Sequence, residues 1–199
     1  IETATTGRVA GILAEVIIGS GGFIVPPKEY FQIVADLVRK AGGLFIADEV
    51  QTGVGRTGAN FFGIQHWGAK PDIIVMAKGL GNGYPIGAVI TTPEIAAAVK
   101  GMLHYNTFGG GPMAMAAAGA VLDVVEKEKL AENAKKVGDR LKNALEKIES
   151  KSDRVGEVRG MGLMLGVELV KSKKSKEHSP ELALAVVDRM KDLGVLVGK

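Results

Sequence analysis

Short, nearly continuous apolar runs recur along the first half of the chain, and glycine, proline or charged residues separate them. The runs are Val9–Val16, Leu44–Ala47, Ile73–Met76 and Ile86–Ile90. Such runs are typical of strands that are buried on both faces. Between the first two, Pro26-Pro27 opens a segment with apolar residues at helical spacing, which Gly42-Gly43 ends. Strands that alternate with helices predict an α/β fold with a parallel or mixed sheet.

The second half of the chain has a different pattern. Apolar spacing predicts an alanine-rich helix from Pro112 to Glu128 and a strongly charged helix from Ala131 to Ser150. Residues Arg154 to Val170 indicate β structure around Gly160-Met161-Gly162, followed by a helix near 180–193 and a strand at 195–197. We therefore expect a boundary near residues 128–150 with a small α+β unit behind it. Because that unit stops on a single strand, we expect it to be incomplete.

Composition narrows the function classes. Of the 199 residues, 46% are hydrophobic and 24% charged, which is an ordinary globular balance. The net charge of +3 reflects four lysines within residues 171–176, which we interpret as a solvated loop because no aromatic residues lie among them. The absence of cysteine excludes disulfides, zinc–thiolate sites and cysteine nucleophiles, and favours a reducing compartment such as the cytoplasm. No apolar run approaches the roughly 18 residues of a membrane-spanning helix.

Two chemically capable residues follow the ends of predicted strands. Asp48 follows one strand, and Lys78 follows another and precedes the glycine-rich segment Gly79–Gly83. In open α/β sheets the carboxyl ends of the strands form the crevice in which ligands bind. A desolvated lysine amine can form a Schiff base, and glycines allow a bulky cofactor to approach. The alternatives are a solvated surface lysine and an aspartate that caps the next turn.

Further residues could complete a cofactor site. Val50 would lie on the same side as Asp48 and offer an apolar surface, and Gln51 is a neutral hydrogen-bond donor. The segment Asn106–Pro112 combines a hydroxyl with exposed amides at the start of a predicted helix. That arrangement suits an anion, although a simple helix cap and flexible loop fits the segment equally well.

Three segments in this order and spacing, Ile46–Arg56, Met76–Gly83 and Asn106–Pro112, resemble the class III aminotransferases of the ornithine, acetylornithine and GABA type. These are fold-type I enzymes that use pyridoxal 5'-phosphate. Within the class, the chain is most similar to the mitochondrial-type alanine–glyoxylate aminotransferases. The supporting stretches are Thr91–Ala96, Leu103–Gly110 and Val158–Met164.

The resemblance implies a role for each matching residue. Lys78 becomes the Schiff-base lysine and general acid/base, and Asp48 the partner of the protonated pyridine nitrogen. Val50 packs on the ring, and Gln51 bonds its phenolic oxygen. Thr107 binds the phosphate of the neighbouring subunit's cofactor, which implies a homodimer with shared active sites.

The resemblance also implies an organisation and an activity. Residues 1–128 correspond to the second half of the large mixed-sheet cofactor domain, and residues 129–199 to a linker helix and the start of the small C-terminal domain. The expected reaction moves an amino group from an alanine-like or ω-amino acid to glyoxylate or pyruvate by ping-pong half-reactions, in the cytoplasm or the mitochondrial matrix. A lyase, decarboxylase or racemase on the same scaffold is an alternative. Because the family's N-terminal phosphate loop and C-terminal substrate arginine are not found, a non-catalytic fragment is another.

One matching residue departs from the family pattern. Glu15 aligns with a glutamate that gates a substrate-binding arginine, but Val16 and Ile18 stand where the family has proline and glutamine. Glu15 is therefore a candidate substrate residue whose gating role is open.

Other signals favour ordinary structural roles. Gly53–Gly58 matches G-x-G-x-x-G, but it does not lead directly from a strand into a helix, as a dinucleotide site requires. His66, His104 and His178 have no metal-ligand spacing, so we expect no metal site. We interpret His66 and Trp67 as packing residues on a short helix.

Overall fold

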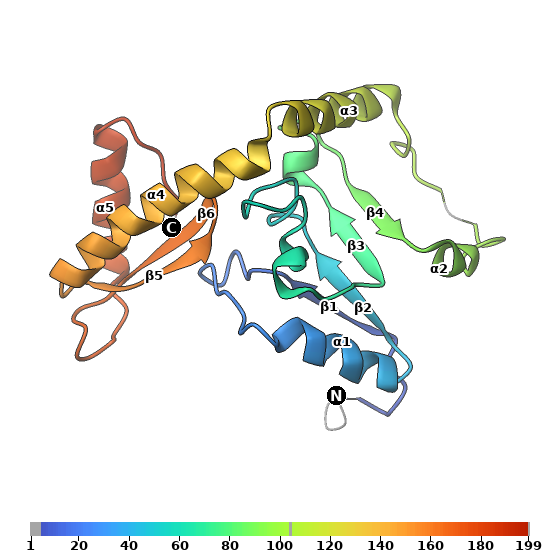
Figure 1. Cartoon of the computed structure of the whole chain (residues 1–199), viewed down its shortest axis with the longest axis horizontal. Coiled ribbons are helices and arrows are strands. Elements are labelled where there is room, and N and C mark those ends of the chain that lie inside the picture. The colour runs from blue at the N-terminus through green and yellow to red at the C-terminus, as the bar shows by residue number, and fades with distance from the viewer. Residues whose placement is uncertain (1–4, 104, 199) are drawn as a thin grey trace.

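The computed structural model describes residues 5–103 and 105–198, and a four-stranded sheet forms its centre (Figure 1). The strands β1 (Gly11–Glu15), β2 (Leu44–Asp48), β3 (Ile73–Met76) and β4 (Ala88–Thr91) lie side by side in that order. The first three are parallel and β4 is antiparallel to β3, which confirms the predicted mixed sheet. The parallel register places Glu15 beside Asp48, and Asp48 beside Val75. The carboxyl ends of the parallel strands therefore bring Glu15, Asp48 and Lys78, which follows β3, to the same end of the sheet.

One side of this sheet is covered by α1 (Tyr30–Lys40), which buries Phe31, Ala35 and Val38. Phe31 stacks on Phe45 of β2 with ring centroids 5.7 Å apart, and it meets Trp67 edge to face at 5.3 Å. Trp67 lies on the short 3-10 helix η1 (Gly63–Trp67), as predicted. Complete burial of a side chain such as Phe31 contributes roughly 1.5–3 kcal/mol. This aromatic cluster holds α1 against one face of the sheet.

The next helices carry the chain away from the sheet. α2 (Pro93–Ala97) follows β4, and α3 (Pro112–Lys127) is joined to α4 (Leu130–Lys151) by Lys129, which has a φ of +52°. The predicted apolar face of α3 is only partly covered, since Ala118 is buried while Met115 and Leu122 are exposed. No helix within the described ranges is long and apolar enough to cross a membrane.

The last part of the chain contains the antiparallel hairpin of β5 (Val155–Met161) and β6 (Met164–Leu169), followed by α5 (Pro180–Asp192). The Gly162 backbone in the hairpin turn lies so close to Gly138 of α4 that a methyl group on Gly138 would overlap it. The strand predicted at 195–197 is wrong. Those residues form no regular element, because no strand in the described part of the chain lies beside them, and Leu196 is 86% exposed.

Candidate active site

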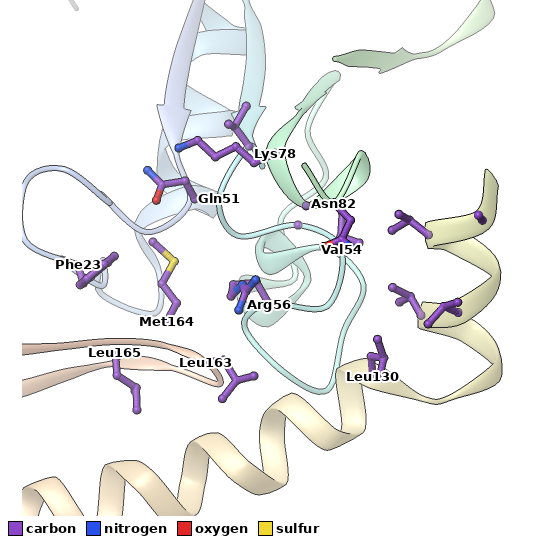
Figure 2. Close-up of a pocket in the computed structure, with 17 residues that line it drawn as sticks. Phe23, Gln51, Val54, Arg56, Lys78, Asn82, Leu130, Leu163, Met164 and Leu165 are labelled. Carbon is purple, nitrogen blue, oxygen red and sulfur yellow. The ribbon is translucent and has the colours of Figure 1, made fainter. Parts of the chain in front are cut away.

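A cleft of about 610 Å³ opens beyond the carboxyl ends of β2 and β3 (Figure 2). Val50, Gln51 and Lys78, which follow these strands, line one end of it. The remaining walls come from the loop that contains Val54 and Arg56, from α3 and from the β5–β6 turn. A cleft of this volume suits a small molecule.

Lys78 stands on a strained backbone in this cleft. Its φ is +40°, it begins the 3-10 turn η2 (Lys78–Leu80), and Leu80 is buried behind it. A left-handed conformation costs a non-glycine residue about 1–3 kcal/mol, and such strain gathers at functional positions. The Lys78 side chain extends toward the part of the cleft that contains Gln51 (Figure 2). The sequence predicted the glycine loop but not the strained conformation of the lysine itself.

Asp48 is half-buried at the end of β2 and does not itself line the cleft. Its Oδ1 accepts a hydrogen bond from the Val50 N–H at 2.9 Å. Asp48 therefore does cap its own turn, as the structural alternative predicted. Among the described residues, Oδ2 accepts no hydrogen bond from the protein.

Gly19 contacts both Glu15 and Gln51. Glu15 Oε2 accepts a hydrogen bond from the Gly19 N–H at 2.9 Å. The Gln51 side-chain amide packs so tightly against Gly19 that a Cβ there would overlap its Nε2. Glu15 thus holds the backbone on which Gln51 rests. The sequence singled out both residues but did not predict the link between them.

Thr107 is not brought into this cleft by its own chain. The segment between α2 and α3 runs outside the sheet (Figure 1), and Thr107 is exposed within it. The Asn106 side chain accepts the Phe108 N–H at 3.0 Å, and α3 then begins after Gly111 without a side-chain cap. Lys78 and Thr107 therefore lie in separate parts of this chain.

Most of the cleft lining was not predicted as part of the site, and Phe23, Arg56 and Asn82 are among these unpredicted residues. With Lys78, Arg56 gives the cleft two cations, and no aspartate or glutamate is among its lining residues. Such a lining favours anionic ligands. Arg56 could have been found as the charged residue inside the G-x-G-x-x-G match. Residues 53–58 form turns and open no helix, unlike the strand–turn–helix arrangement of a dinucleotide-binding loop.

Glu49 is a further residue without a predicted role. It is 1% exposed, and its carboxylate accepts hydrogen bonds from the Thr52 hydroxyl at 2.6 Å, the Gly63 N–H at 2.9 Å and the Ile64 N–H at 2.7 Å. Burial raises the pKa of Glu49, although these donors oppose the shift. A second acidic residue directly after Asp48 was the only signal for it in the sequence.

His66 packs behind the same loop. Its ring nitrogens lie 3.2 Å from the Thr57 hydroxyl and 3.3 Å from the Asn60 side-chain amide, and burial lowers its pKa. The packing role expected of His66 and Trp67 agrees with these contacts. His104 lies outside the described residues. Within residues 5–103 and 105–198, no three potential metal ligands converge.

The family described as aminotransferase class-III matches residues 1–199. An Arabidopsis thaliana protein named alanine–glyoxylate aminotransferase 2 homolog 2, mitochondrial, is 51% identical over the whole chain. A phospholyase from Arthrobacter in complex with phosphoethanolamine superimposes with a TM-score of 0.93 at 37% identity, over 99% of the chain.

A pyridoxal-phosphate-bound amine transaminase from an uncultivated Pseudomonas species superimposes with a TM-score of 0.88 at 40% identity, over 94% of the chain. The chain spans less than half the length of each of these proteins, with 42% of the plant relative, 47% of the phospholyase and 45% of the transaminase covered.

Proposed function

The chain belongs to the class-III aminotransferase family, and from that premise we propose that it provides the catalytic lysine and the ring-binding residues of a pyridoxal 5'-phosphate enzyme. The whole protein transfers an amino group from an amino acid to a 2-oxo acid. The observation that supports this most strongly is the Lys78 amine in a cation-lined cleft, on strained backbone, beside the strand end that carries Asp48.

The residues present fit this cofactor. Lys78 offers an amine inside the cleft for covalent attachment, and Asp48 Oδ2 is an acceptor without a protein donor among the described residues. Val50 provides an apolar surface, and the Gln51 amide provides a donor for the phenolic oxygen of the ring. These are the roles that the family resemblance assigns to the same four residues.

Each residue has a distinct part in the reaction. When bound, pyridoxal phosphate supplies an aldehyde that condenses with amines and a ring that accepts electrons from the substrate's α-carbon. Lys78 Nζ holds the cofactor between turnovers and moves the proton at the α-carbon. The Asp48 carboxylate keeps a proton on the ring nitrogen through an ion pair. Leu163, Met164 and Leu165 contribute apolar side chains to the wall of the cleft.

We propose an alanine-like or ω-amino donor and glyoxylate or pyruvate as acceptor, because the plant relative is named for alanine and glyoxylate. The test runs the two half-reactions separately on the purified whole protein. With alanine alone, we expect one pyruvate for each active site and no further turnover. Glyoxylate added afterwards should yield an equal amount of glycine. Continuous turnover of alanine without any 2-oxo acid would contradict amino transfer.

A phospho-lyase is the second candidate. Two observations favour it: the close superposition of the phospholyase and the presence of Arg56 in a cleft without acidic residues. Arginine suits phosphate because its planar donors bind it in pairs. The same preparation distinguishes the two reactions, since a lyase releases inorganic phosphate from phosphoethanolamine when no 2-oxo acid is present.

The proposed enzyme is a homodimer with shared active sites. The segment between α2 and α3 exposes large apolar side chains, with Leu103 99%, Tyr105 82% and Phe108 88% exposed. Contiguous exposed apolar and aromatic side chains are typical of subunit interfaces. Thr107 lies among them and outside its own cleft. We infer that this segment packs against a second copy, where Thr107 binds the phosphate of the partner's cofactor.

Mixing two differently impaired variants tests this arrangement. Thr107→Ala should raise the Kd for pyridoxal phosphate about tenfold to a hundredfold, because one hydrogen bond to a charged group is lost. When Lys78→Ala and Thr107→Ala subunits are refolded together in equal amounts, mixed dimers contain one site with both residues intact. About a quarter of all sites should then regain high cofactor affinity, by the statistics of a two-fold dimer. No gain over the separate variants would overturn the shared site.

We further propose that residues 1–128 form part of the cofactor domain and that residues 129–199 form the linker helix and the start of the small domain. The turn at Lys129, where the chain leaves α3 for α4, supports this division. The plant relative is named as mitochondrial, which supports the mitochondrial matrix over the cytoplasm for the whole protein. Cell fractionation distinguishes the two compartments.

A further inference from the structure

We propose that Glu49 is a positioning residue of the cleft, which fixes both ends of the loop 50–62 and so aims the side chains that meet the cofactor. The inference rests on the proposed function for its catalytic meaning, and on contacts within the chain for its structural basis. Glu49 does not line the cleft, so it acts only through other residues.

Glu49 extends the sheet to the start of the loop. Its N–H donates to the Val75 carbonyl of β3 at 2.9 Å, one residue beyond the last paired residue of β2. Its own carbonyl accepts the Gly53 N–H at 3.0 Å. The backbone between Asp48 and Gly53, which carries Val50 and Gln51, is therefore held at both ends by Glu49.

The Glu49 carboxylate also joins the two ends of the loop. Oε2 accepts from Thr52 near the start of the loop and from the Gly63 N–H just after its end, and Oε1 accepts from the Ile64 N–H. The fit at this point is tight, because a Cβ on Gly63 would lie 2.8 Å from Thr52 Cβ and 3.2 Å from Glu49 Oε2. Between these anchors, the loop brings Val54 and Arg56 to the cleft.

A carboxylate suits this position better than any neutral side chain of the same size. All three groups that face it are donors, and an ionised carboxylate only accepts hydrogen bonds. In Glu49→Gln, the side-chain NH₂ must face Gly63 or Ile64, so one buried backbone N–H loses its acceptor. Losing such a partner costs about tenfold to a hundredfold in the local equilibrium.

The chain offers a matched control. Asp72 also anchors neighbouring elements, since its Oδ2 accepts the Phe45 N–H of β2 at 2.8 Å and its Oδ1 forms an ion pair with Arg39 of α1 at 3.0 Å. Asp72 precedes β3 and therefore lies at the end of the sheet opposite the cleft. Asp72→Asn perturbs a similar anchor without touching the loop 50–62.

The experiment compares Glu49→Gln and Asp72→Asn in the whole protein. In the cofactor-free form, amide hydrogen exchange at Gly63 and Ile64 should accelerate about tenfold to a hundredfold in Glu49→Gln and stay unchanged in Asp72→Asn. In the cofactor-loaded form, kcat should fall about tenfold or more in Glu49→Gln while the KM for the amino donor changes less than threefold. Asp72→Asn should lower the thermal unfolding midpoint but leave kcat within a factor of two.

The outcomes distinguish a failure of the proposed function from a failure of the positioning role of Glu49. If the unaltered protein fails to attach pyridoxal phosphate at Lys78, the proposed function fails, and the exchange data still decide whether Glu49 anchors the loop. If the unaltered protein is active and both variants behave alike in exchange and kcat, the positioning role of Glu49 is overturned. Faster exchange in Glu49→Gln with unchanged kcat also overturns it, because Glu49 would then be only a structural residue.

Discussion

Replacing Lys78 with alanine should abolish covalent attachment of pyridoxal phosphate and lower kcat by roughly a thousandfold or more, since the same amine both attaches the cofactor and moves the proton. In the structure, no other lysine lines the described cleft, so no neighbouring amine can replace it. Borohydride treatment followed by peptide mass analysis measures attachment directly. The unaltered protein should carry the reduced cofactor on the peptide that contains Lys78.

A surface lysine provides the control. Lys135 forms an exposed ion pair with Asp139 on α4 at 2.6 Å. Lys135→Ala should therefore change stability by less than about 1 kcal/mol and leave cofactor attachment intact. If Lys78→Ala still fixed the cofactor to the protein after borohydride treatment, the assignment of Lys78 would be wrong.

Asp48→Asn should lower kcat by roughly a hundredfold to a thousandfold, because a neutral amide provides no charge to keep the ring nitrogen protonated. Asparagine retains an oxygen that can accept the Val50 N–H, so the turn that Asp48 Oδ1 now caps should remain. The variant therefore tests the charge at Oδ2 more than the local fold.

Measurements of kcat and of thermal stability together distinguish a role of Asp48 in catalysis from a role in capping the turn. The thermal unfolding midpoint of cofactor-free Asp48→Asn should stay close to that of the unaltered protein, while kcat falls. A variant that loses stability but retains kcat within about threefold would show that Asp48 only caps the turn. That result would support the structural alternative, and another group would have to pair with the ring.

Much of the fold follows from local patterns. The apolar runs at Leu44–Ala47 and Ile73–Met76 became β2 and β3, and the helical spacing after Pro26-Pro27 became α1, because burial on one or both faces leaves a period in the sequence. The same patterns placed Asp48 and Lys78 at neighbouring strand ends. The family resemblance assigned their chemistry, which strand-end position alone had left open.

Other features depend on which surfaces meet, and no local pattern records that. The predicted apolar face of α3 leaves Met115 exposed, and residues 195–197 form no strand, because the described residues offer neither of them a covering surface. Phe23 and Met164 are far apart in the sequence and lie together in the cleft only because the β5–β6 hairpin packs beside the loop after β1.

The sequence by itself determined the mixed sheet, the helices around it and the pair of Asp48 and Lys78 at its edge. Only the tertiary structure showed the strained backbone of Lys78, the glycine that supports Gln51 and the buried carboxylate of Glu49. The physical reason is that secondary structure and strand-end position arise from periodic burial along the chain. Strain, close packing and the partners of a buried charge arise from backbone groups that approach one another only after folding.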